Sequence, residues 1–243
     1  MGQLDNKIVV VTGAGRGIGK AISLAFATEG AKVCCVARTA QEIEVTLSQI
    51  ENAGGKGMAI AADLTDPQAV EESFDKVYSE CGGLDVLIAN AGGLSDTEFV
   101  EHSDPELWKE ILDANLVTSY LSIQAAIPLL KRRGGGKIVT MGSGMGHKGV
   151  PGNSAYACAK AGLWMLTRVL AEELLSDNIS VNELIPGPVH TSTFPGNSAI
   201  PTPNLQREWF KQPEDVVPMA LFLATQPPIG PTAQSYSLMR RVN

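Results

Sequence analysis

Short apolar runs alternate with longer amphipathic stretches, and this alternation constrains the fold of the chain more than any other feature. We predict strands at 8–11, 32–36, 58–61, 86–89, 138–141, 179–185 and, on the weakest pattern, 234–238. Helices are predicted near 17–29, 40–53, 67–80, 105–131, 154–176 and 213–225. Strands this apolar are usually covered on both faces. The pattern therefore predicts an α/β fold: a single Rossmann-like doubly wound domain over 1–243, with a mainly parallel sheet of about seven strands and helices on both faces.

Composition excludes several classes of protein. The net charge is -7 over 243 residues, which disfavours a nucleic-acid surface. No apolar run approaches the roughly 18 residues of a membrane span, and no signal-like apolar stretch follows Met1. The four cysteines form no CxxC motif or His/Cys cluster, so neither a disulfide framework nor a metal site is expected. We therefore expect a cytoplasmic protein with no nucleic-acid or membrane partner.

A glycine-rich turn follows the first predicted strand. Gly13, Gly17 and Gly19 fit the pattern TGxxxGxG, whereas the usual GxGxxG pattern does not fit. Such a turn lets the backbone approach a pyrophosphate closely, and it points helix-terminal N–H groups at the anion. Its position between a strand and a helix favours a dinucleotide site.

The end of the second predicted strand indicates which dinucleotide is bound. Sites for NAD commonly place an acid there for the ribose hydroxyls. Here Arg38 follows the strand, no acid is present, and Arg16 lies in the glycine turn. Two guanidinium groups suit the 2′-phosphate of NADP. We predict NADP(H) as the preferred cofactor, with NAD(H) as the alternative; each arginine by itself is also compatible with plain solvation.

Tyr156 and Lys160 stand four residues apart in a predicted helix, so both side chains share one face. A nearby ammonium group is expected to lower the pKa of the phenol. Ser143 follows the strand 138–141, at the strand end that borders a ligand crevice. Asn115 lies inside the predicted helix 105–131, where an amide is mildly unfavourable. For each residue alone, an ordinary structural role is the competing interpretation.

Together these residues resemble the short-chain dehydrogenase/reductase family over essentially the whole chain. Asn115, Ser143, Tyr156 and Lys160 match its catalytic tetrad in order and spacing. Asp63 matches its adenine-contacting aspartate, Asn90-Ala91-Gly92 its NAG motif, and Pro186-Gly187 with Thr191 its PGxxxT segment. The residues expected to contact the dinucleotide are Gly13, Gly15, Arg16, Gly17, Ile18, Gly19, Arg38, Asp63, Leu64, Asn90, Ala91, Gly92, Tyr156, Lys160, Pro186, Gly187, Val189 and Thr191.

The resemblance also implies roles for the tetrad. Tyr156 would be the general acid in reduction and the general base in oxidation. Lys160 would bind the nicotinamide ribose and lower the pKa of Tyr156. Ser143 would orient the substrate carbonyl, and Asn115 would hold a water in a proton relay. Family members are commonly homotetramers, so a homotetramer or a dimer packed through helices 105–131 and 154–176 is expected.

The substrate is less closely defined. Within the family, the chain looks most like 3-oxoacyl-[acyl-carrier-protein] reductases, so a ketone or 3-oxoacyl thioester is the leading expectation. Dehydrogenation of a sugar, sterol or other secondary alcohol is the alternative, and a non-catalytic NADP-binding regulator is a third hypothesis. An acyl carrier protein or CoA thioester is a candidate partner. The basic run Lys131-Arg132-Arg133 could meet an acidic carrier protein, or it could complement a helix dipole. Glu172-Glu173 and a C-terminus without Asp-Gly-Gly depart from the reductase pattern.

Two further segments near the expected site are interpreted from composition. The Pro/Gly-rich stretch from Pro186 to Pro203 is interpreted as a mobile flap over a cleft, with an ordinary surface loop as the equal alternative. The family resemblance implies that substrate specificity lies in the loop 190–212, which is expected to be a mobile substrate loop. His147 and Lys148 lie close to Ser143 in sequence and are expected to be exposed to solvent.

Overall fold

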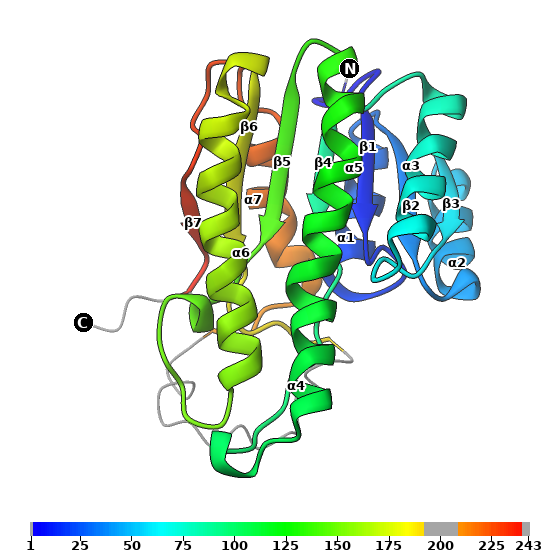
Figure 1. Ribbon diagram of the computed structural model, residues 1–243. Helices are drawn as coiled ribbons and strands as arrows, with labels where there is room; N and C mark the ends of the chain where they lie inside the picture. Colours follow the sequence, from blue (N-terminus) through cyan, green and yellow to red (C-terminus); the bar gives the residue numbers. More distant parts are fainter. Residues whose placement is uncertain (1, 192–208, 240–243) are drawn as a thin grey trace.

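The computed structural model describes residues 2–191 and 209–239. Within them, seven strands form one sheet in the order β3-β2-β1-β4-β5-β6-β7, and every neighbouring pair is parallel (Figure 1). The strands are β1 Ile8–Thr12, β2 Lys32–Ala37, β3 Lys56–Ala61, β4 Val86–Ala89, β5 Gly136–Met141, β6 Ile179–Ile185 and β7 Ser235–Ser237. The predicted parallel α/β sheet is confirmed, including its weakest strand.

Helices cover both faces of this sheet. One apolar cluster joins the sheet to α3 (Pro67–Cys81), α5 (Thr118–Arg132) and α6 (Ser154–Glu173). A second cluster joins the other face to α1 (Gly17–Thr28), α2 (Ala40–Asn52) and α7 (Val217–Ala224). The chain is therefore doubly wound, as the continuously apolar strands require.

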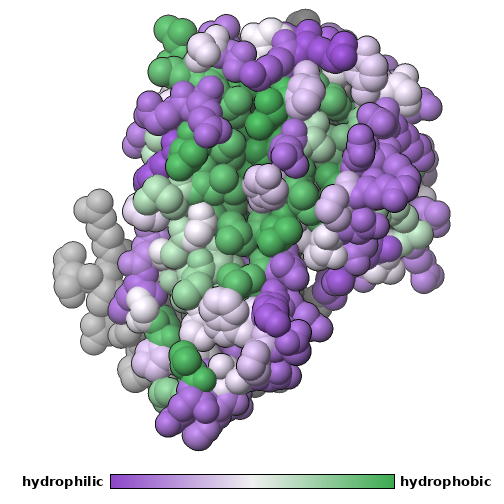
Figure 2. Space-filling view, viewed as in Figure 1, coloured by the Kyte–Doolittle hydropathy of each residue, from purple (hydrophilic) through white to green (hydrophobic). Residues whose placement is uncertain are grey.

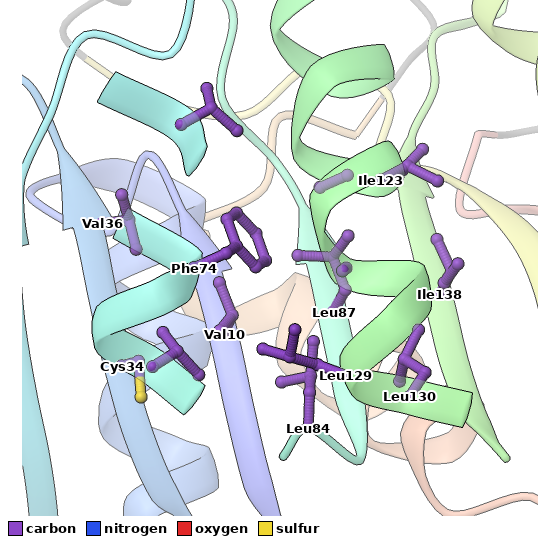
Figure 3. Packing of buried hydrophobic residues seen from close by; sticks show 14 of the residues in the cluster. Val10, Cys34, Val36, Phe74, Leu84, Leu87, Ile123, Leu129, Leu130 and Ile138 are labelled. Atoms are coloured by element: carbon purple, nitrogen blue, oxygen red, sulfur yellow. The ribbon is translucent and has the colours of Figure 1, made fainter. Parts of the chain in front are cut away.

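Alternate residues of each strand serve the two clusters. Val10 and Leu87 belong to the cluster under α3 and α5, where Phe74, Ile123 and Leu130 meet them (Figure 3). Their neighbours along the strands, such as Val9 and Ile88, belong to the cluster under α1, α2 and α7. Each fully buried side chain of this kind contributes roughly 1.5–3 kcal/mol, so the central strands are fixed from both sides.

The helix boundaries follow the sequence signals with one exception. Asp66 and Asp104 cap their helices, each accepting a hydrogen bond from the backbone N–H two residues further on. The predicted helix 105–131, however, is interrupted. It consists of α4 (Pro105–Leu112), a π-helical turn (Asp113–Val117) and α5. Short 3-10 turns lie at Val100–His102, Gly144–Gly146, Leu175–Asp177 and Pro213–Val216.

The carboxyl ends of the strands lie along a single edge of the sheet, because all strands are parallel. The chain leaves β1 toward β2 on one side, and β4 pairs with β1 on the other. In such sheets the reversal of strand order opens a crevice at this edge. Most of the predicted loop 190–212 lies outside the described residues. None of the helices that are described is long and apolar enough to cross a bilayer.

Candidate active site

A groove of about 850 Å³ lies at the carboxyl edge of the sheet. Its lining brings together segments that are far apart in sequence, from the glycine turn to the segment after β6. All but one of the predicted cofactor residues line it: Gly13, Gly15, Arg16, Gly17, Ile18, Arg38, Asp63, Leu64, Asn90, Ala91, Gly92, Tyr156, Lys160, Pro186, Gly187, Val189 and Thr191. The exception, Gly19, lies behind the turn.

The glycine turn is built for close backbone approach. Gly13 adopts φ +67°, a conformation that glycine tolerates best. A Cβ on Gly19 would overlap the carbonyl oxygen of Gly13, so Gly19 lets the helix start directly against the turn. The Asn90 amide donates to the Thr12 carbonyl at 2.9 Å and holds the end of β4 against this turn. Gly19 therefore supports the groove from behind.

The segment after β6 meets the same turn from the opposite side of the groove. Gly17 adopts φ +54°, and a Cβ there would lie 3.1 Å from Cγ2 of Thr191. Val189 forms an isolated parallel bridge with Lys211, which fixes the backbone just before Thr191. The PGxxxT segment and the glycine turn are thus brought into contact, although 174 positions separate the residues numbered 17 and 191.

Charged groups gather at the β2 end of the groove. Arg16 and Arg38 are exposed and line it, together with Asp63. The Asp63 carboxylate accepts hydrogen bonds from the backbone and hydroxyl of Thr65, at 3.0 and 2.8 Å. These bonds, and then Arg38, hold the pKa of Asp63 below its ordinary value. Glu42 on α2 also lines the groove and lies close to Gly15, an acid that the sequence reasoning did not consider.

Tyr156 lies in the first turn of α6 and faces the groove. Burial raises the pKa of its phenol above 10.0, and a hydrogen bond with Ser143 opposes this rise. The net direction of this pKa shift is therefore opposite to the lowering that the sequence predicted. Ser143 accepts a hydrogen bond from the Met145 backbone at 3.2 Å, which fixes the hydroxyl just after β5.

Lys160 lies one turn further along α6, and its ammonium group is buried. Nζ donates to the carbonyl of Met141 at 2.9 Å and lies 5.6 Å from the centre of the Tyr156 ring. Burial lowers the pKa of Lys160 to about 8, while the negative charge of Glu183 opposes that shift. The structure therefore brings Ser143, Tyr156 and Lys160 together, as the spacing predicts.

Asn115 is fully buried in the π-helical turn. Its amide nitrogen donates to the carbonyls of Leu94 and Ile111, at 2.8 and 3.0 Å. Its oxygen accepts from the Gly93 backbone at 2.9 Å. The side chain thus ties the helix to the loop after β4. Asn115 does not line the groove itself, and its side chain forms its hydrogen bonds with backbone atoms.

Sequence reasoning missed several groups that the fold brings to this edge. Thr12 accepts hydrogen bonds from the backbone of Asn90 and Ala91 at 3.0 Å each, which aligns the ends of β1 and β4. Glu183, on β6, lies near enough to Lys160 to affect its pKa. The pattern of a buried strand does not indicate that this residue belongs to the site. His147 and Lys148 are exposed, as expected, and the His147 ring also contacts Glu183.

Comparisons with known proteins identify the family to which the chain belongs. A model of the short chain dehydrogenase family matches residues 7–199. The 3-oxoacyl-[acyl-carrier-protein] reductase of Escherichia coli is 37% identical over 187 residues, covering 77% of this chain and 75% of that protein. A 3beta-hydroxysteroid dehydrogenase of Mediterraneibacter gnavus is 33% identical over 199 residues, covering 82% and 72%.

Solved structures show the same relationship. A short-chain type dehydrogenase/reductase from Mycobacterium marinum has a TM-score of 0.89 at 31% identity and covers 96% of this chain and 94% of its own. The chain therefore belongs to the short-chain dehydrogenase/reductase family of oxidoreductases.

Proposed function

We propose that this protein is an NADP(H)-dependent reductase that converts a ketone into a secondary alcohol. The observation that carries the proposal is the arrangement of Ser143, Tyr156 and Lys160 beside a groove lined by a glycine turn. The groove suits a dinucleotide because Gly13 and Gly17 leave its floor free of side chains, while Arg16 and Arg38 offer positive charge. A bound nicotinamide would supply the hydride for the carbonyl carbon.

The side chains of the chain supply the matching proton. The Tyr156 hydroxyl gives its proton to the carbonyl oxygen as that oxygen gains negative charge, and the Ser143 hydroxyl hydrogen-bonds to the same oxygen. The raised pKa of Tyr156 keeps the phenol protonated before reaction, which suits an acid in the reductive direction. The Lys160 ammonium then stabilises the phenolate that remains. In oxidation, the same groups act in reverse.

The preference for NADP rests on charge at the β2 end of the groove. Arg16 and Arg38 both line the part of the groove that an adenosine 2′-phosphate would approach. Guanidinium groups bind phosphate through paired hydrogen bonds. Glu42 on the same lining is the group that favours NAD, so NAD(H) stays the alternative.

A 3-oxoacyl thioester is the leading substrate class, because the Escherichia coli relative is named for that activity. The relative from Mediterraneibacter gnavus supports the alternative, oxidation of a sterol or similar alcohol.

The basic run 131–133 at the end of α5 does not favour carrier-protein docking. Lys131 pairs with Asp177 at 2.7 Å and Arg133 with Asp85 at 3.1 Å, at the end of the sheet opposite to the groove. Its interpretation as a helix C-terminus with compensated charge is the better supported one.

We infer that the chain works as one domain, since a single sheet takes strands from Ile8 to Ser237. The loop 190–212 is assigned to the substrate site because it contains Thr191, which lines the groove.

Tyr156→Phe tests the reaction. We expect kcat for NADPH-dependent ketone reduction to fall by about 10²–10⁴-fold, since the phenylalanine has no proton to give. NADPH affinity, measured by fluorescence titration, should change little. Tyr236→Phe is the matched control and should keep full activity. Turnover retained in Tyr156→Phe would reject the proposed acid.

Substrate profiling tests the class of reaction. We expect NADPH consumption with 3-oxoacyl thioesters to exceed that with sugars and cyclic ketones. A faster NADP⁺-dependent oxidation of sterols would favour the second candidate. Cofactor binding without turnover on the whole panel would favour the non-catalytic regulator.

A further inference from the structure

A carboxylate lies buried near Lys160, outside the catalytic tetrad. Glu183 stands in the middle of β6 and is 0% exposed, as are Val181 and Leu184 beside it. Burial of an ionised carboxylate costs several kcal/mol unless hydrogen bonds and charges compensate for the lost water. A side chain of this kind in a central apolar strand therefore calls for a partner and a role.

Two residues hydrogen-bond directly to this carboxylate, and a third acts through one of them. The Ser235 hydroxyl, on β7, donates to Oε2 at 2.5 Å. Nε2 of His147, in the segment before α6, lies 3.0 Å from Oε2 and 3.2 Å from Oε1. Arg168, on α6, donates to the Ser235 hydroxyl at 3.2 Å. Both oxygens of Glu183 are thus held in place, and the positive Arg168 lies behind Ser235.

The Glu183 and Lys160 side chains lie against two consecutive residues, Gly142 and Met141 respectively. Nζ of Lys160 donates to the carbonyl of Met141, at the end of β5. The next residue, Gly142, has no side chain, and a Cβ there would overlap Oε1 of Glu183. Glycine at this position therefore leaves room for the carboxylate, one residue from the Met141 carbonyl that Lys160 contacts.

The sign of the interaction follows from this placement. Burial lowers the pKa of Lys160, whereas the negative charge of Glu183 raises the same pKa. The other groups that face Lys160 are the Tyr156 ring on its own helix and the Met141 carbonyl on β5. Those that face Glu183 are His147, Ser235 and, through Ser235, Arg168.

We propose that Glu183, held by Ser235 and His147, is a positioning residue that keeps the Lys160 ammonium charged and fixed beside Tyr156. The proposal deepens the proposed function and rests on it, because a charged Lys160 is what stabilises the phenolate of Tyr156. Glu183 acts through Lys160 and touches no reacting atom.

A direct titration of Lys160 tests this role without a substrate. Protein labelled with ¹³C at lysine Cε is titrated by NMR, with the Lys160 signal assigned by its loss in Lys160→Arg. We expect Glu183→Gln to lower the pKa of Lys160 by about one unit. Glu183→Met should do the same, and an apolar residue of similar size is often well tolerated at a buried ionic site. Asp85→Asn is the matched control, a buried carboxylate paired with Lys7 and Arg133 at the opposite end of the sheet.

Activity supplies the second readout. In Glu183→Gln the alkaline limb of the kcat/KM profile should move about one pH unit lower, because Lys160 loses its proton earlier. Activity should fall about tenfold at pH 8.5 and hardly at pH 6.5, and Glu183→Asp should restore part of it. An unchanged pKa of Lys160 in both Glu183 variants, or an equal loss of activity at every pH, would overturn the proposal. If the parent protein reduces no carbonyl, the proposed function fails, while the NMR titration still decides the role of Glu183.

Discussion

The Tyr156–Lys160 pair shows how far residue spacing leads and where it stops. A separation of four residues correctly places both side chains on one helix face, beside Ser143. The direction of the Tyr156 pKa shift could not be predicted in the same way, because burial outweighs the hydrogen bond with Ser143, and burial depends on the folded surroundings. Glu183 escaped notice for the same reason, since its partners Ser235 and His147 come from other elements.

Arg38→Asp tests the cofactor preference. We expect the ratio of kcat/KM with NADPH to that with NADH to fall at least tenfold, because a charge-assisted hydrogen bond to phosphate contributes about 1.5–3 kcal/mol. Arg132→Asp is the control, since Arg132 lies over the Tyr78 ring at the other end of the sheet. Equal affinity of the parent protein for NADP and NAD would contradict the assignment of Arg16 and Arg38.

The interrupted helix shows what amphipathic periodicity cannot predict. The pattern over 105–131 is typical of one helix, yet Asp113–Val117 form a π-helical turn. A π-turn inserts extra backbone without any mark in composition, and such turns are frequent at functional sites. The unfavourable placement of Asn115 in a helix was the available signal. Its side chain hydrogen-bonds to the Leu94 and Ile111 carbonyls instead of facing solvent.

Asn115→Ala should therefore cost stability as well as activity. The substitution leaves the carbonyls of Leu94 and Ile111 and the N–H of Gly93 without their partner, which we expect to lower the free energy of unfolding by about 2–3 kcal/mol. Urea denaturation followed by circular dichroism measures the change. Gln124→Ala, at an exposed position on α5, should shift it by less than about 0.5 kcal/mol. A similar small shift for Asn115→Ala would show that these bonds contribute little.

The centre of the sheet was predictable because β1, β4 and β6 are buried on both faces, and buried strands of this kind form near-continuous apolar runs in the sequence. The groove followed from the same argument, since parallel strands bring their carboxyl ends to one edge. The contact between Gly17 and Thr191 could not be predicted from either motif alone, because it depends on how the segment after β6 crosses the sheet edge. The loop 190–212, most of which lies outside the described residues, stays a prediction.

Hydrophobic side chains gather on the outer face of α5 and α6, where Figure 2 shows a band of hydrophobic residues. Tyr120, Met165 and Val169 are 45%, 49% and 45% exposed there. An apolar patch of this kind is typical of an interface between subunits. We propose that two copies of the chain pack through these helices, as the expected dimer or homotetramer requires.

Met165→Glu tests this interface. A buried unpaired carboxylate would weaken association, so we expect a smaller particle than the parent in light scattering at micromolar concentration. Val45→Glu is the control, because Val45 is 48% exposed on α2, which lies on the opposite face of the sheet. A parent protein that is already monomeric would contradict the proposed assembly.

The contact between the glycine turn and Thr191 has a consequence for how the chain responds to a bound dinucleotide. A molecule lying along the groove would touch the first loop of the sheet and the segment after its sixth strand at the same time. A dinucleotide bound in the groove would then make residues 13–19 and residues 186–191 open together, although the two segments are remote in sequence. Amide hydrogen exchange at 13–19 and 186–191 should slow together as NADPH is added, with a single apparent affinity for both.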